Sequence, residues 1–249
     1  MNIIKMIFIL SIFSNYFSIK GDLPTEIKKC PAGDEVCIST LITQILRTYP
    51  KGVPSIGLDA VDVIHFTDVV VAEADSSTPV QLNLKFNTLT VRGFENTTIL
   101  HAVGFDKDLE QPFELSGWIP LLQLNGEYEA SGRVLLLPVQ GTGEAELQLK
   151  DCKFKCKVRA AEDQRNGGKL YAKITKVKCV VDVKGLHVNF QNLFNDQALS
   201  DSMNQLININ WQDVWHTMGK GINKAVDQVS YSLLSRVALK LPYDDFYLN

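Results

Sequence analysis

Alternating apolar and polar residues predict β-structure over the middle of the chain, across about residues 61–190. Within residues 80–86 every second residue is apolar, and the apolar phase then moves to Leu89 and Val91. Successive side chains of a strand point to opposite faces, so a change of phase predicts a bulge or a sharp bend at this point.

The clearest strand signal covers residues 122–136, where one parity is apolar and the other is polar. This pattern predicts one long strand with a dry face toward the core and a wet face toward solvent. Gly126 and Gly132 fall on the dry face. A missing side chain there permits either tight bending of the sheet or empty space beneath it.

The period becomes helical toward the C-terminus. Residues 199–207 begin a helical pattern, residues 208–210 interrupt it, and a second apolar stripe then continues over residues 211–241. At 1.5 Å per residue the second helix would be about 45 Å long, more than a compact domain needs for a surface helix. A shorter helical stripe covers residues 38–49. These elements predict an α+β fold, with residues 22–249 as a single domain.

The N-terminus has the pattern of a secretory signal. Lys5 supplies positive charge, residues 6–13 are almost entirely apolar, and Gly21 lies at a position compatible with cleavage before Asp22. The apolar run is shorter than the ~20 residues that span a bilayer, which favours a removed signal over residues 1–21 rather than a retained anchor. We therefore expect a secreted, extracellular protein without stable membrane insertion.

One sequon, Asn96-Thr97-Thr98, fits that compartment. Glycosylation of Asn96 and an ordinary polar turn are both compatible with this short motif.

In an oxidising compartment, the two cysteines near the N-terminus favour a disulfide. Six residues separate Cys30 from Cys37, and these include Pro31 and Gly33, which suit a small loop. A metal site would need further ligands nearby, but the sequence has no CxxC or HxxxH spacing. We predict that a Cys30–Cys37 disulfide fixes the start of the helix that follows.

Three further cysteines lie in the predicted sheet. Residues 165–169 (RNGGK) predict a hairpin turn. A turn centred on residues 167–168 would place Cys156 opposite Cys179, whereas a wider loop would place Cys152 there. One bridge and one free, buried thiol are therefore expected, and the pattern leaves the choice open.

Charge limits the class of partner. Without Lys5 and Lys20, 23 basic residues face 28 acidic residues, a net charge of −5, which argues against nucleic acid as a partner. The wet faces of the predicted hairpin nevertheless carry a basic strip, which fits a solvated sheet face better than contact with an anionic membrane. Its members are Lys153, Lys155, Lys157, Lys176 and Lys178.

Several stretches occur in an order that resembles one known family. After the two N-terminal cysteines these are PKGVPSIGLDAVDVI (50–64), LNGEYEASGRVLLLPVQGTGEAELQL (124–149), FQNLFND (190–196), INWQDVW (209–215) and LPYDDF (241–246). Together they resemble the insect takeout and haemolymph juvenile-hormone-binding protein family. The resemblance implies a strongly curved antiparallel sheet wrapped around a long C-terminal helix, as in BPI-like, TULIP-type lipid-binding modules. A hydrophobic tunnel would lie between the sheet and the helix.

The function that this resemblance implies is carriage of a small hydrophobic ligand, such as a juvenile-hormone-like terpenoid, a fatty acid or a prenyl quinone. Lipid tunnels are mostly apolar, with few polar groups. The Tyr128 hydroxyl would bond either a main-chain carbonyl or helix side chain, or the polar group of a ligand. The expected lining comes from the dry sheet face and the helix stripe: Phe86, Tyr128, Val134, Trp215, Met218 and Ile222.

An enzyme and a signalling or interaction protein are the alternatives to a carrier. An esterase acting on such ligands usually has G-x-S-x-G, and the sequence contains no such motif. No histidine neighbours a serine in a recognisable motif, so we predict neither enzymatic activity nor a cofactor or metal. A secreted signalling or interaction protein with a structural lipid and a receptor of unknown identity is the alternative that the sequence does not separate from a carrier.

Overall fold

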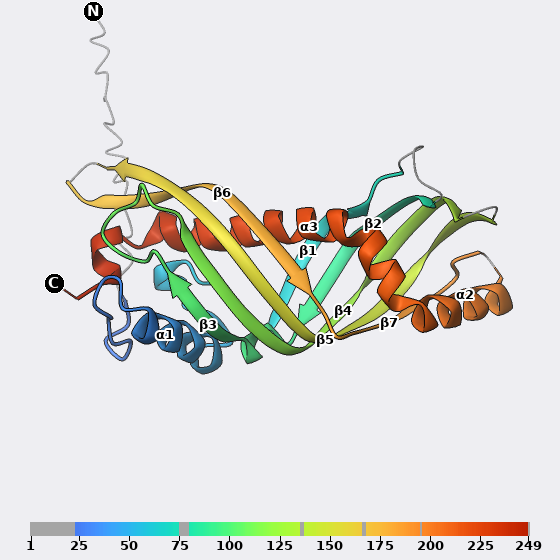
Figure 1. Cartoon of the computed structure of the whole chain (residues 1–249), viewed down its shortest axis with the longest axis horizontal. Helices are drawn as coiled ribbons and strands as arrows, with labels where there is room; N and C mark the ends of the chain where they lie inside the picture. Colours follow the sequence, from blue (N-terminus) through green and yellow to red (C-terminus); the bar gives the residue numbers. More distant parts are fainter. Residues whose placement is uncertain (1–22, 75–79, 135–136, 166–167, 195, 249) are drawn as a thin grey trace, which may run out of the picture.

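The computed structural model describes residues 23–248 apart from 75–79, 135–136, 166–167 and 195. The predicted signal segment, residues 1–21, lies outside the described residues. Figure 1 shows an elongated molecule, with α1 and the C-terminus at one end and α2 at the other. The helices are α1 (Glu35–Thr48), α2 (Gln197–Ile209) and α3 (Trp211–Lys240), with short 3-10 turns η1 (Pro54–Ile56), η2 (Phe94–Asn96) and η3 (Tyr243–Phe246). The strands are β1 (Val63–Ala72), β2 (Val80–Arg92), β3 (Thr98–Val103), β4 (Phe113–Val134), β5 (Leu137–Gln164), β6 (Leu170–Asp182) and β7 (Gly185–Phe190).

The seven described strands form one antiparallel sheet. Five of them follow the order β1-β2-β4-β5-β6, while β3 pairs with β4 and β7 pairs with β5. β4 pairs with β5 along its whole length of 22 residues. Long paired strands accumulate the right-handed twist of a sheet. The sheet accordingly curves, with β1 and β2 on one side of α3 and β5 and β6 on the other (Figure 1).

The bend predicted in the second strand is confirmed. The pairing of β2 with β4 shifts register between Phe86 and Thr88, where the apolar phase changes. Gly126 of β4 lies at this point, because a Cβ there would be 2.0 Å from the carbonyl oxygen of Thr88. Gly126 therefore permits tight bending and close backbone approach, the first of the two roles open to a glycine on the dry face.

The observed strand begins earlier and ends earlier than the strand predicted over residues 122–136. β4 begins at Phe113 and ends at Val134, which pairs with Leu137 at the beginning of β5. Leu136 lies outside the described residues. The continuous alternation did not reveal this reversal of the chain, because apolar residues continue through it.

The three predicted helices are present, and their bounds differ from the predicted ones by at most three residues. The Asp34 carboxylate caps α1 by accepting a hydrogen bond from the Cys37 amide at 3.0 Å, and Asp196 caps α2 in the same way through Leu199. The predicted interruption is confirmed, since α2 ends at Ile209 and α3 starts after Asn210. Within the described residues, no helix is long and apolar enough to cross a membrane.

Candidate ligand-binding interior

Apolar side chains between the sheet and α3 fall into three groups along the length of the sheet. Near α1 and the C-terminus, Val226 and Leu234 pack against buried residues of β5 and β6. Midway, Trp215 and Ile222 pack with residues of β4 and β5. Toward α2, Met218 packs against a group formed by β1, β2 and β4. The first part of α3 therefore contacts two groups, with Met218 in one and Trp215 and Ile222 in the other, whereas the rest of the helix contacts the third.

This packing buries α3 only in part. Of its 30 residues, all of them described, Trp215 and Ala238 are the buried ones. The apolar residues between them, including Met218, Ile222 and Val226, stay partly exposed although they pack against buried residues of the sheet. A close-packed interior would remove such side chains from contact with solvent. The apolar stripe of α3 therefore keeps part of its surface accessible.

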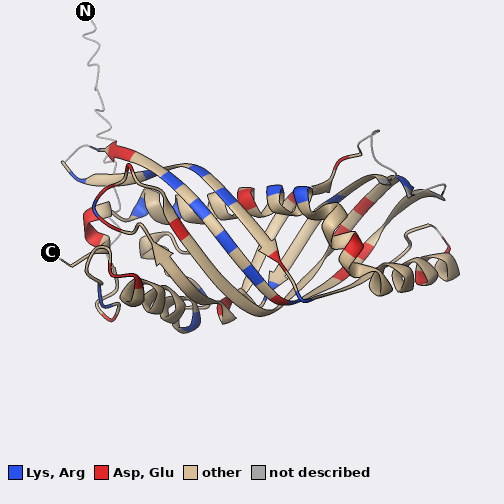
Figure 2. Cartoon of the chain, in the orientation of Figure 1, with Lys and Arg blue, Asp and Glu red and all other residues tan. Residues whose placement is uncertain are grey.

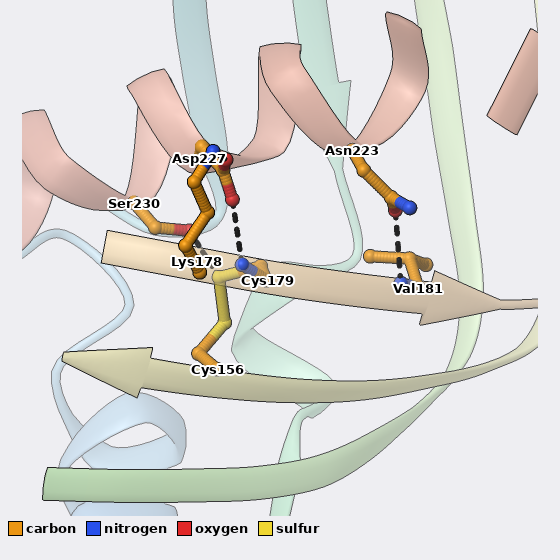
Figure 3. Close-up of a disulfide and its surroundings, with 7 residues drawn as sticks. All are labelled: Cys156, Lys178, Cys179, Val181, Asn223, Asp227 and Ser230. Atoms are coloured by element: carbon orange, nitrogen blue, oxygen red, sulfur yellow. Dashed lines mark hydrogen bonds and ion pairs between the residues drawn. A yellow bond between two sulfur atoms is a disulfide. The ribbon is translucent and has the colours of Figure 1, made fainter. Parts of the chain in front are cut away.

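Polar side chains of α3 pair with the free edge of β6. Asp227 Oδ1 accepts a hydrogen bond from the Cys179 amide at 2.6 Å, and Asn223 Oδ1 accepts one from the Val181 amide at 3.2 Å (Figure 3). β6 is the last strand of the sheet, so no further strand satisfies these N–H groups. The helix thus satisfies main-chain donors that a neighbouring strand would otherwise take.

The same helix contacts the opposite end of the sheet. Gly221 lies against β1, where a Cβ would be 1.7 Å from the carbonyl oxygen of Val71. At Gly219 a Cβ would have no heavy atom within 4 Å. Glycine is therefore required at the first position by close approach, and α3 bridges the two terminal strands of the sheet.

α2 is joined to β7 by two side-chain amides, those of Asn204 and Asn208. Asn204 accepts from the Phe190 amide and donates to its carbonyl oxygen, both at 2.9 Å. Asn208 does the same for Val188, at 2.8 and 2.9 Å. The two asparagines are one helical turn apart, and Phe190 and Val188 are one strand repeat apart. Sequence analysis did not identify these residues, although polar residues four apart in an apolar helix were a usable signal.

Phe86 and Tyr128, two of the residues predicted to line a tunnel, are buried in the group near α2. The Tyr128 hydroxyl donates a hydrogen bond to the carbonyl oxygen of Gln191 at 2.7 Å, and its ring meets Phe190 edge-on. Burial raises the pKa of Tyr128 to about 12. Of the two roles considered for this hydroxyl, the structure shows the bond to the main chain, so the phenol is satisfied without a ligand.

The other predicted lining residues are distributed along α3. Met218 belongs to the group that contains Phe86, whereas Trp215 and Ile222 belong to the middle group. Val134 ends β4, and its side chain lies outside the described residues. Five of the six residues are therefore placed in two neighbouring groups.

The sheet cysteines form a Cys156–Cys179 disulfide, with the two residues directly opposite each other in β5 and β6. Figure 3 shows this bridge beneath α3, where Cys179 Sγ lies 3.5 Å from the Ser230 hydroxyl. Next to the turn Gln164 pairs with Leu170, and a register shift between Arg159 and Ala160 then brings Cys156 opposite Cys179. Cys152, the alternative partner, is a buried free thiol whose pKa is raised to about 12, first by burial and then by the nearby charge of Asp151.

The N-terminal staple joins Cys30 to Cys37, with 5.8 Å between their Cα atoms. The Cys30 carbonyl also accepts a hydrogen bond from the Leu248 amide at 2.9 Å. The same bridge therefore fixes the start of α1 and holds the C-terminal segment. Asn96, the predicted glycosylation site, lies at the end of η2 with an exposed side chain, and its modification stays a prediction.

Two open grooves lie elsewhere on the surface. One, of about 390 Å³, lies between residues 51–60 and the end of α3, and the other, of about 600 Å³, crosses β1, β2, β4 and β5. Neither groove is lined by any of the six residues predicted to form a tunnel. Among the described residues, no group of three or more His, Cys, Asp or Glu side chains is arranged to hold a metal ion.

Comparison with known proteins gives a family match from the sequence and a fold match from the structure. Residues 7–248 match the family described as haemolymph juvenile hormone binding protein (JHBP). Similar relatives are the circadian clock-controlled protein daywake of Drosophila melanogaster (25% identity over 228 residues, 90% of this chain and 88% of the relative) and of Drosophila yakuba (24% over 243 residues, 96% and 94%).

Among solved structures, takeout 1 of Epiphyas postvittana matches with a TM-score of 0.75 and 24% identity, covering 90% of this chain and 100% of that chain. This likeness shows the fold, a curved antiparallel sheet wrapped around a long C-terminal helix, as predicted. Because the family match extends over nearly the whole sequence, the chain belongs to the takeout and haemolymph juvenile hormone binding protein family.

Proposed function

We propose that this protein is a secreted carrier that binds one small hydrophobic ligand between the sheet and α3. The observation that carries the proposal is the stripe of partly exposed apolar residues on α3, which faces buried apolar residues of the sheet. Apolar surface that is enclosed but not fully packed is where a hydrophobic ligand gains the most from leaving water. Membership of a family described as binding juvenile hormone supports the same role.

The ligand classes that suit this interior are a juvenile-hormone-like terpenoid, a fatty acid and a prenyl quinone. Each has a long apolar part that would lie along α3, in contact with Met218 and Ile222. The Tyr128 hydroxyl already bonds Gln191, so the apolar lining would supply most of the affinity. Two disulfides favour the secreted state, because such bonds persist in oxidising compartments.

The direct test is native mass spectrometry of protein purified from its natural source, followed by lipid extraction. We expect a stoichiometric adduct with the mass of a terpenoid, fatty acid or quinone. Apo protein that takes up none of these compounds when they are added in solution would refute carriage.

The position of the ligand is tested by filling the space along α3. Ile222→Trp adds an indole within the middle apolar group, whereas Gln228→Trp adds the same ring at an exposed position of the same helix. Displacement of a fluorescent fatty-acid analogue should show affinity reduced about fivefold or more for the first variant, equivalent to ~1 kcal/mol, and nearly unchanged for the second. Normal binding by Ile222→Trp combined with a lower melting temperature would make Ile222 an ordinary core residue.

A further inference from the structure

The outer side of the sheet near α1 carries a basic face, defined as Lys153, Lys155, Lys157, Arg159, Lys176 and Lys178. These residues are exposed and lie on neighbouring strands, with Lys157 directly opposite Lys178 and Arg159 opposite Lys176. Side chains of directly paired residues share one face of a sheet. Figure 2 shows the positive residues following β5 and β6 as two adjacent lines.

Carboxylates within the fold neutralise only part of this face. Glu114 lies between Lys155 and Lys157, at 3.0 and 3.1 Å, and these two ammonium groups lower the pKa of its carboxyl. Lys178 pairs with Asp227 at 2.5 Å. Within the described part of the chain, Lys153, Arg159 and Lys176 form no ion pair.

The arrangement has a cost for the isolated protein. Like charges directly opposite each other in an antiparallel pair are destabilising, and the basic face contains two such pairs. The fold does not require them, because Thr or Ser would satisfy an exposed strand equally well. An anionic partner would offset this repulsion.

Exposed aliphatic side chains lie in the same rows. Val180 is 63% exposed and lies opposite Lys155, while Val103 is 49% exposed and lies opposite Glu114. A solvated face needs no such apolar groups between its charges. Cations combined with exposed aliphatic side chains suit the interface of an anionic bilayer, where charge attracts the surface and apolar groups enter the headgroup region.

The opposite half of the same sheet surface is acidic. Before Asp151, whose φ of 51° marks a change of phase in β5, the outward residues of β4 and β5 are mostly uncharged but include Glu127, Glu129, Glu144 and Glu146, and Glu127 lies opposite Glu144. The outer surface of the sheet is therefore polarised along its length (Figure 2). An anionic surface would attract one end and repel the other, which would orient the protein.

We propose that the basic face docks peripherally on membranes that contain anionic phospholipids. Docking would bring the protein to the bilayer in which hydrophobic molecules of low solubility dissolve. It does not depend on carriage, because vesicle binding requires only the outer face, whereas ligand uptake in solution requires only the interior. The two proposals therefore fail independently.

Vesicle sedimentation tests the docking. The wild-type protein should bind phosphatidylcholine vesicles that contain one-quarter phosphatidylserine at about 50 mM NaCl, and should be released at about 500 mM, where charges are screened within ~5 Å. It should not bind phosphatidylcholine alone. Equal binding to both vesicles, or binding to neither, would overturn the proposal.

The variant Lys153→Gln/Arg159→Gln/Lys176→Gln removes three cations that have no ion pair to lose. Each cation near an anionic bilayer contributes roughly fivefold to partitioning, so the triple change should reduce it by about a hundredfold. The control Lys28→Gln/Lys220→Gln/Lys240→Gln also removes three exposed cations without a described ion pair, makes the same change in net charge outside the basic face, and should bind nearly as the wild type does. Equal losses in the two variants would show that net charge alone acts.

The basic face could instead bind a second copy of this chain, whose acidic half would cover it. Sedimentation velocity without vesicles tests this alternative. A salt-sensitive dimer that the triple variant abolishes, together with absent vesicle binding, would assign the face to self-association and overturn membrane docking. A monomer that binds anionic vesicles supports docking.

Discussion

The Asn204 side chain offers the sharpest test of how α2 is attached to the sheet. Its buried amide makes two hydrogen bonds of 2.9 Å to the main chain of Phe190. Asn204→Ala would leave a buried N–H and a buried C=O of β7 without these partners. A net loss of about 1–2 kcal/mol for each group predicts a decrease of about 2–4 kcal/mol in the free energy of unfolding.

Two related variants separate this effect from a general loss of helix stability. Asn208 makes the same pair of bonds to Val188 but is only partly buried, so water replaces its amide more easily and Asn208→Ala should cost about 1–2 kcal/mol. Asn210 is exposed and bonds only within its own helix segment, through the Leu206 carbonyl. Its change to Ala should cost less than about 1 kcal/mol.

Urea unfolding followed by circular dichroism gives these differences from the shift in midpoint, provided that the slope is unchanged. The predicted order of loss is Asn204, then Asn208, then Asn210. An Asn204→Ala protein within about 0.5 kcal/mol of the wild type would show that the paired amide does not stabilise β7.

Two more predictions concern the interior. Gly219→Ala should raise the free energy of unfolding by up to ~1 kcal/mol, because alanine favours a helix and its Cβ meets no neighbour. Gly221→Ala should lower the free energy of unfolding by about 1–3 kcal/mol, because its Cβ would collide with β1, and urea titration of both variants measures the two changes. Tyr128→Phe should lower stability by about 1 kcal/mol by removing the bond to Gln191, while the affinity ratio of an oxygenated ligand to its hydrocarbon analogue stays unchanged. A selective loss for the oxygenated ligand in a binding titration would instead mean that the hydroxyl contacts the ligand.

Local patterns predicted the parts of the fold that depend on local physics. The change of apolar phase before Leu89 predicted the bend in β2, and the polar interruption ending at Asn210 predicted the break between α2 and α3. Both could be predicted because the order of apolar and polar residues reflects which face of an element is buried. The turn at residues 165–169 placed Cys156 opposite Cys179 in one of two registers. A register shift between Arg159 and Ala160 also contributes to this pairing. The sequence pattern does not reveal the loop length or such a shift, so the choice between Cys152 and Cys156 stayed open.

Features that depend on long-range approach were not predictable in the same way. Asn223 and Asp227 meet the main chain of β6, more than 40 residues earlier, and any strand sequence offers the same N–H groups. The residue types in β6 therefore do not indicate which N–H groups these side chains bind. The fit of Gly221 against β1 depends likewise on the path of a distant strand. The partial exposure of apolar residues along α3 depends on the three-dimensional placement of the sheet, which periodicity does not report.

The attachment of α2 and α3 to the strand edges also has a consequence for the order in which the protein matures during synthesis. A ribosome produces all seven described strands of the sheet before residue 197, so nascent chains carry the exposed edges of β6 and β7 until α2 and α3 emerge. Uncovered edges promote association between chains. Premature termination between β7 and α2 would therefore yield a sheet that tends to aggregate. Synthesis of α2 and α3 covers the edges of β6 and β7 and so protects the new chain from association with other chains.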